Sequence, residues 1–124
     1  MTKSCIRVFA DVAQIQQCKT EIDRVEPTIG SIARALSLSG NEVRLKILYL
    51  LSKESQLCPC DLSDILGMTV PAISQHLKKL REGGLVVSDK VGQTIFYSLQ
   101  KENLKVINPI LESLAITEQK STVS

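Results

Sequence analysis

One stretch of the chain decides the fold: Thr69-Val70-Pro71-Ala72-Ile73-Ser74-Gln75-His76-Leu77-Lys78-Lys79-Leu80. Its apolar residues recur every three or four positions, which is the period of an amphipathic helix. This helix is expected to run over residues 70–82 and to end at Gly83-Gly84, because glycine accepts the left-handed backbone that a helix C-cap favours. The face opposite the apolar stripe centres on Gln75, with Ala72, Lys78 and Lys79 beside it, and Ser74 and His76 lie on its two flanks.

That polar face suits the major groove of double-stranded DNA. Glutamine can bond N6 and N7 of adenine, whereas lysine and serine can hold phosphates. The N-terminal end of such a helix enters the groove in helix-turn-helix proteins, which adds one residue to the set. The predicted DNA contacts are Thr69, Ala72, Ser74, Gln75, His76, Lys78 and Lys79. Two alternatives stay open: the face could be merely solvated, and His76 could pack against its neighbours.

Four more helices are expected before this recognition helix, over residues 11–24, 28–38, 42–52 and 60–66. The first should stop at Glu26-Pro27, because a residue before proline is disfavoured in the α region. Asn41 is the expected N-cap of the third helix, and Gly67 should end the fourth. The fourth helix and the recognition helix are joined by a short turn, so together they predict a helix-turn-helix.

A β-hairpin and a last helix are expected after the recognition helix. Residues 85–99 contain two β-rich runs and a glycine turn, which predict a hairpin with Lys90 and Gln93 near its tip, in reach of the DNA. The last helix, 101–116, contains Pro109, which should kink it or split it in two. This order predicts a mainly α, winged helix-turn-helix protein. Its expected parts are a flexible N-terminal arm, the DNA-binding and dimerisation domain, and a tail, at residues 1–10, 11–116 and 117–124.

Size and composition narrow the class of protein. The chain has 124 residues, of which 44% are apolar, enough for one globular domain. Its net charge is only +2, so any DNA binding must come from a local basic patch. No apolar run approaches a membrane span, and the first residues lack the apolar stretch of a signal peptide, so we expect a cytoplasmic protein without a membrane partner. Thiols stay mostly reduced there, which favours metal or redox sensing over structural disulfides.

Two of the four cysteines lie one residue apart, in Leu57-Cys58-Pro59-Cys60-Asp61-Leu62. Residues i and i+2 of a helix point about 200° apart, so two thiols in mid-helix could not share one ion. Pro59 changes this, because it disfavours helical geometry at Cys58 and is accommodated at the first helical position. Cys58 would then lie at the cap and Cys60 in the first turn, where both sulfurs can converge. The helix N-terminus also stabilises the thiolate form that binds metal ions.

A complete metal site needs further ligands, since Zn(II) and similar ions take about four and soft ions prefer sulfur. The remaining candidates are Cys5, on the N-terminal arm, and Cys18. Cys18 shares the apolar stripe of helix 11–24, so core packing explains it as well as metal ligation does. The alternative for Cys58 and Cys60 is that they are small buried apolar residues.

These motifs resemble the ArsR/SmtB family of bacterial metal-responsive winged-helix repressors. The resemblance covers residues 29–114 and is most specific in the runs 57–62, 74–80 and 84–86. It implies a homodimer that represses an operon from its operator DNA and leaves that DNA when metal binds. The cadmium/lead-sensing branch is most similar, and it implies Cys58 and Cys60 as core ligands with Cys5 as an arm ligand.

The chain also departs from the family pattern. Pro59 stands where valine is common, and Cys5 and Cys18 lie farther apart than the arm cysteines of that branch. Arsenite sensors often carry a third cysteine three residues after the pair, where this chain has Ser63. The expected inducer is therefore a soft ion such as Cd, Pb or Zn, with arsenite as an alternative. A second zinc site of many members should be absent, because its positions here are Lys101, Asn103, Leu114 and Thr117.

Three rival classes of protein are compared with a metal-responsive repressor. A thiol-redox repressor of the same fold would use Cys58 or Cys60 in a persulfide, or in a disulfide with Cys5 or Cys18. An enzyme is not expected, because the sequence has one histidine, no βαβ context around the cysteines and no phosphate-binding glycine loop. A protein-binding winged helix without DNA affinity is the third possibility.

Overall fold

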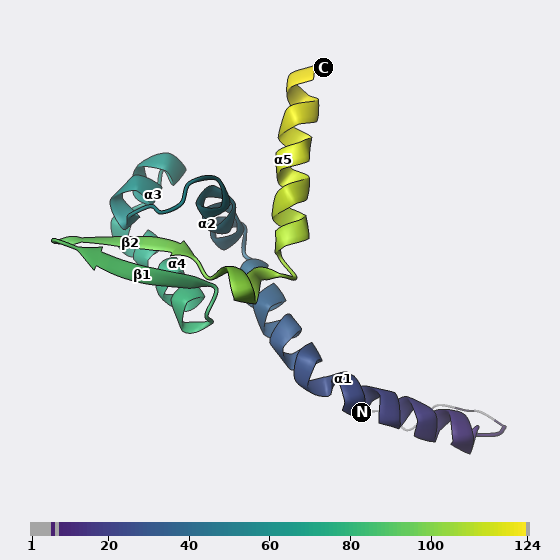
Figure 1. Cartoon of the computed structure of the whole chain (residues 1–124). Coiled ribbons are helices and arrows are strands. Elements are labelled where there is room, and N and C mark those ends of the chain that lie inside the picture. Colours follow the sequence, from purple (N-terminus) through teal and green to yellow (C-terminus); the bar gives the residue numbers. More distant parts are fainter. Residues whose placement is uncertain (1–5, 7, 124) are drawn as a thin grey trace. The chain divides into compact units, whose positions relative to one another are not determined.

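The computed structural model describes residue 6 and residues 8–123 of the chain. The predicted fold class is confirmed, because the structure is mainly helical with one two-stranded antiparallel hairpin (Figure 1). It falls into two compact units divided between residues 31 and 32. The elements, in chain order, are α1 Val12–Ser39, α2 Glu42–Lys53, α3 Pro59–Leu66, α4 Val70–Glu82, β1 Val86–Val91, β2 Thr94–Leu99, the 3-10 helix η1 Lys101–Leu104 and α5 Asn108–Val123.

The predicted break at Glu26-Pro27 is wrong. α1 is one helix, and Pro27 lies inside it. An interior proline removes one backbone hydrogen bond and costs roughly 3 kcal/mol. Apart from Gly30, the other residues of α1 have ordinary helix propensities, and helix formation is cooperative, so the turns on both sides continue through the proline.

The core of the second unit forms around α2 and α4. Ile47, Leu48 and Leu51 of α2 are buried. The helix begins where expected, because the Asn41 side chain accepts a hydrogen bond from the amide of Arg44 at 3.1 Å. α4 contributes its apolar stripe, of which Ile73, Leu77 and Leu80 are buried and Val70 remains 38% exposed.

The ends of α3 and α4 differ from each other. Gly67 ends α3 with a left-handed backbone (φ 65°), as predicted. Gly83 ends α4 in the right-handed region (φ −82°), and the left-handed residue is Gly84 (φ 77°), so the expected left-handed cap comes one residue late. Asn103 donates to the Gly84 carbonyl at 2.7 Å and helps to hold this exit.

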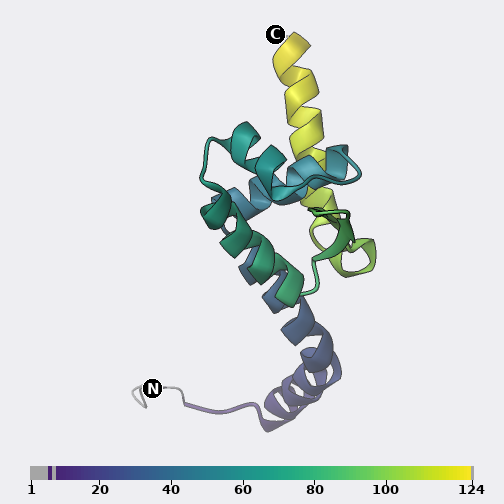
Figure 2. The ribbon, with the colours of Figure 1, turned by 90° about the vertical axis from the view of Figure 1, so that its left-hand side faces the viewer.

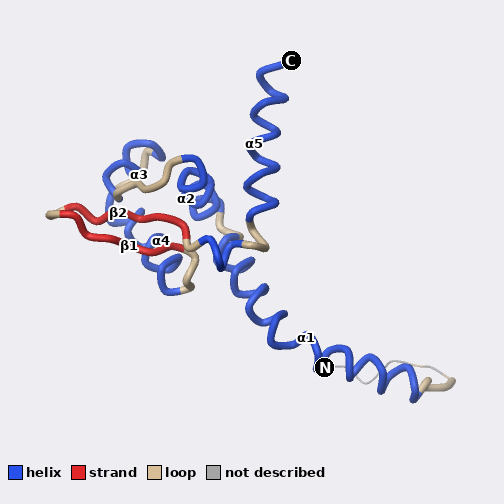
Figure 3. Tube along the Cα trace, in the orientation of Figure 1, coloured by secondary structure: helices blue, strands red, loops and turns tan. Residues whose placement is uncertain are grey.

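The predicted hairpin is confirmed and has an additional bridge. β1 pairs with β2 in the register Val86↔Leu99, and the two-residue turn begins at Gly92, with φ 65°. Outside the hairpin, Leu57 forms an antiparallel bridge with Tyr97 of β2, so the loop between α2 and α3 lies beside the hairpin (Figure 3).

The last helical segment is split, as Pro109 predicted. η1 ends before the split, and α5 begins at Asn108 with Pro109 at its second position, where the missing N–H costs nothing. α5 continues to Val123, beyond the predicted end at residue 116. Within the described part of the chain, no helix is both long and apolar enough to cross a membrane.

Candidate functional site

The two neighbouring cysteines lie at the start of α3, where the sequence predicted them. Cys58 is the N-cap residue with an extended backbone (φ −96°, ψ 164°), Pro59 occupies the first turn, and Cys60 follows it. Both thiols are free; Cys58 is half-buried and Cys60 is exposed. The alternative that both are buried apolar residues is therefore wrong, because Cys60 is open to solvent.

The backbone around Cys58 is held on both sides. Its own amide donates to Oδ2 of Asp61 at 3.3 Å, which closes the first turn of α3. On the other side, Leu57 exchanges two backbone hydrogen bonds with Tyr97. The Cys58 sulfur is thus carried by a segment fixed to both α3 and β2.

The pair supplies only part of a metal site. Among the described residues, no group of three or more His, Cys, Asp or Glu side chains could hold an ion. Two free thiols at a helix start are nevertheless a donor set that suits a soft ion. Cys18 is exposed on α1, in the first unit, so core packing within this chain does not explain it. Cys5, the predicted arm ligand, lies outside the described residues.

The predicted DNA face of α4 is open to solvent. Ser74, Gln75, Lys78 and Lys79 are exposed, and Ala72 is half-buried. In the view turned by 90°, α3 and α4 follow one another along the side of the second unit (Figure 2). On the hairpin, Lys90 and Gln93 are also exposed, the latter within the turn.

Thr69 has a structural role that the sequence analysis missed. It is the N-cap of α4, and its hydroxyl oxygen accepts a hydrogen bond from the Ala72 amide at 3.3 Å. A threonine followed by a Pro-containing first helical turn is the local signal for this role. The cap uses the hydroxyl oxygen only as an acceptor, so the O–H of Thr69 remains available to donate to a phosphate.

His76 is half-buried on the flank of α4 that faces Arg44. Its Nδ1 is buried without a hydrogen-bond partner among the described residues. Burial, and then the charges of Arg44 and Lys79, lower the pKa of His76 below 6.5. The imidazole is therefore neutral at pH 7, which supports the packing alternative for this residue. The sequence did not identify Arg44 as a neighbour of His76, because no local pattern shows that α2 and α4 pack together.

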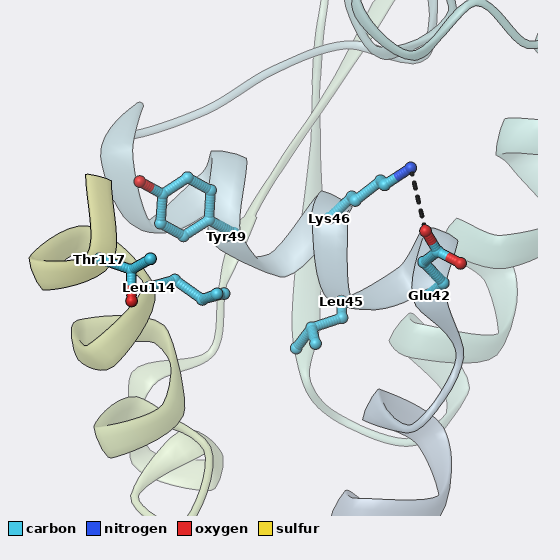
Figure 4. Close-up of a pocket in the computed structure, with 6 residues that line it drawn as sticks. All are labelled: Glu42, Leu45, Lys46, Tyr49, Leu114 and Thr117. Atoms are coloured by element: carbon cyan, nitrogen blue, oxygen red, sulfur yellow. Dashed lines mark ion pairs between the residues drawn. The ribbon is translucent and has the colours of Figure 1, made fainter. Parts of the chain in front are cut away.

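A cavity of about 510 Å³ lies between α2 and α5 (Figure 4). Leu114 of α5 points into it beside Tyr49 of α2 (Figure 4). The charged groups at its rim, Lys46 and Glu42, form an ion pair at 3.5 Å. The described residues that line it are Glu42, Leu45, Lys46, Tyr49, Leu114 and Thr117, a set that offers no thiol or imidazole to an ion.

The known proteins that this chain resembles in sequence or structure are transcriptional regulators. A family described as "Bacterial regulatory protein, arsR family" matches residues 41–88. The cadmium resistance transcriptional regulatory protein CadC of Listeria innocua is 31% identical over 96 residues, which cover 77% of this chain and 76% of the relative. The arsenical resistance operon repressor of Escherichia coli is 46% identical over 60 residues, 48% of this chain and 51% of the relative. The crystal structure of the transcriptional regulator HlyU from Vibrio vulnificus is 34% identical with a TM-score of 0.66, covering 76% of this chain and 97% of that one.

Proposed function

The chain belongs to the ArsR family of bacterial regulatory proteins, and we propose that it is a repressor that binds operator DNA as a homodimer and is released by a soft metal ion. The resemblance to this family is thus confirmed. So is the expectation that the chain is no enzyme, since the matched family and relatives are transcriptional regulators. A regulator of this kind would act in the cytoplasm, where the chromosome lies.

DNA binding is assigned to α4 and the hairpin. The exposed side chains of Ser74, Gln75 and Lys78 can face the major groove, while Lys90 and Gln93 can reach the backbone beside it. Two copies would place two α4 helices in successive major grooves. Exposed apolar side chains on α1 and α5 support a second copy that covers them; they are Ile22, Ile29, Leu36, Ile110, Leu114 and Ile116.

Metal sensing is assigned to the cysteines. The observation that carries this proposal is the pair of free thiols at the start of α3, directly before the recognition helix α4. Cys58 and Cys60 would hold the ion, and Cys5 and Cys18, of the same or the other protomer, would complete its ligand set. The relative named for cadmium resistance favours Cd(II) among the candidate ions.

Release follows from the position of the pair. Since α3 packs on α4, a change in the position of Cys58 and Cys60 shifts the spacing or angle of the two recognition helices. The ion must bind the DNA-free form more tightly for this to work, and the coupling is reciprocal, so operator DNA weakens ion binding.

The test replaces both thiols, Cys58→Ser with Cys60→Ser. We expect this variant to bind its promoter DNA like the wild type and to stay bound when Cd(II) or Pb(II) is added. The matched control is Ser55→Ala in the preceding loop, which should release normally. Normal metal-driven release from the double-serine variant would show that the assigned site is wrong.

Arsenite and thiol oxidation are the alternatives. The relative named for arsenical resistance supports arsenite, with Cys5 or Cys18 as the third thiol. A redox repressor would form a disulfide or persulfide at Cys58 or Cys60. Anaerobic release assays with Cd(II), arsenite and an oxidant in parallel distinguish them, because only the inducing agent releases DNA at stoichiometric concentration.

A further inference from the structure

The residue before the thiol pair is hydrogen-bonded to the wing. The Leu57 amide donates to the Tyr97 carbonyl at 3.1 Å, and the Tyr97 amide donates to the Leu57 carbonyl at 2.8 Å. Leu57 and Tyr97 therefore form an isolated antiparallel bridge at one edge of β2, although the two residues lie far apart in the sequence. Cys58 follows this bridge directly.

The backbone pairing of Leu57 with Tyr97 is continuous with the pairing of β2 with β1. Tyr97 is only 8% exposed, and Leu57 packs against the same core. On the other edge of β2, Tyr97 lies opposite Ser88 of β1, and the pairing runs on to Val91↔Thr94 at the turn. A paired backbone thus connects Leu57 with the tip, where the exposed Lys90 and Gln93 lie.

Cys58 has little freedom between these fixed points. Its amide is bound to Asp61 on one side, and both polar backbone groups of Leu57 are bound to Tyr97 on the other. A sulfur that is drawn toward a shared ion must therefore rotate its own side chain or displace one of the two attachments. Packed elements respond to such displacements by moving as units rather than by bending.

We propose that the Leu57–Tyr97 bridge transmits ion binding at Cys58 to the wing, so that the inducer acts on the DNA contacts of Lys90 and Gln93 as well as on α4. This inference rests on the proposed function, because it requires Cys58 to be a ligand. It makes the bridge a coupling element in addition to a structural one.

Two variants distinguish the contribution of the backbone bridge from that of the Leu57 side chain. Leu57→Pro removes the amide that donates to Tyr97, whereas the matched control Leu57→Ala truncates the side chain and keeps both backbone hydrogen bonds. Each chain is titrated anaerobically with Cd(II), with thiolate-to-metal absorption recorded beside operator affinity. We expect equal absorption, normal release for Leu57→Ala, and a metal effect on affinity about fivefold smaller for Leu57→Pro.

Because Leu57→Pro could fail to fold, the wild-type chain supplies an independent readout. Amide hydrogen exchange at Tyr97 and at the tip residues Lys90 and Gln93 should change together by about tenfold when Cd(II) binds in the absence of DNA. Metal absorption with unchanged exchange at the wing would overturn the coupling and leave the metal site intact. No absorption at all would refute the metal site itself, and the coupling with it.

Discussion

Gly83 shows how packing, rather than backbone conformation, can require a glycine. Its φ of −82° suits any residue, but an added Cβ would overlap Cδ1 of Leu38 and lie 3.4 Å from the Lys79 carbonyl oxygen. Overpacking usually costs about 1–3 kcal/mol, and rotation of the Leu38 side chain, whose far end makes the contact, keeps the cost near the lower bound. We expect Gly83→Ala to lower the free energy of unfolding by about 1 kcal/mol, measured by urea denaturation.

The matched control is Gly30→Ala, because Gly30 lies inside α1. An added Cβ at Gly30 meets nothing within 4 Å, so alanine should stabilise its helix by about 1 kcal/mol at most. Equal stability of Gly83→Ala and the wild type would contradict the close approach of α4 to Leu38.

His76 makes stability depend on pH in a defined direction. Burial, Arg44 and Lys79 lower its pKa from 6.5, so the unfolded chain takes up this proton at a higher pH than the folded chain. The contribution of His76 is present above about pH 6.5 and is lost as the pH falls through the lowered pKa. Since it is the chain's single histidine, His76→Gln should reduce the loss of stability between about pH 7.5 and 5.5. An unchanged pH profile, from urea denaturation at several pH values, would argue against the buried imidazole.

Among the elements, α4 is proposed to make both base contacts and phosphate contacts. Lys78 is exposed and can neutralise one phosphate, so Lys78→Ala should weaken binding to all DNA sequences and reduce the salt slope of log K by about 0.9. Gln75→Ala should instead reduce discrimination between operator and unrelated DNA, with the slope unchanged. Fluorescence anisotropy over a salt series measures both. If Gln75→Ala changed the salt slope and Lys78→Ala changed the discrimination between sequences, α4 would contact DNA through another face.

Local signals predicted the elements of the second unit well. Asn41 and Pro59 mark the first turns of α2 and α3, so the starts of these two helices follow from adjacent residues, and Gly67 marks the end of α3. The failure at Pro27 has a physical reason, because one unfavourable residue does not outweigh the cooperative turns around it.

Contacts between distant residues could not be predicted in this way. The Leu57–Tyr97 bridge and the approach of Arg44 to His76 depend on how elements pack, and no periodicity in the sequence encodes them. The candidate site was predicted for the same reason that the helices were: Cys58 and Cys60 are neighbours, and Pro59 between them fixes the start of α3.

For the whole molecule, the proposal needs thiols in addition to the pair at the start of α3. Cys58 and Cys60 belong to the second unit, whereas Cys18 belongs to the first. Ion binding can govern DNA release only if the ion favours a state of the protein in which the two α4 helices of a dimer no longer match the operator.

The most direct measurement is an anaerobic titration of the protein on a fluorescent fragment of its own promoter, with thiolate-to-metal absorption and DNA release recorded in the same cuvette. We predict that Cd(II) or Pb(II) raises the absorption and releases the DNA in parallel, with both changes complete at the same metal-to-protein ratio. Full absorption with the DNA still bound, or release without thiolate absorption, would contradict the assignment of these cysteines as the switch.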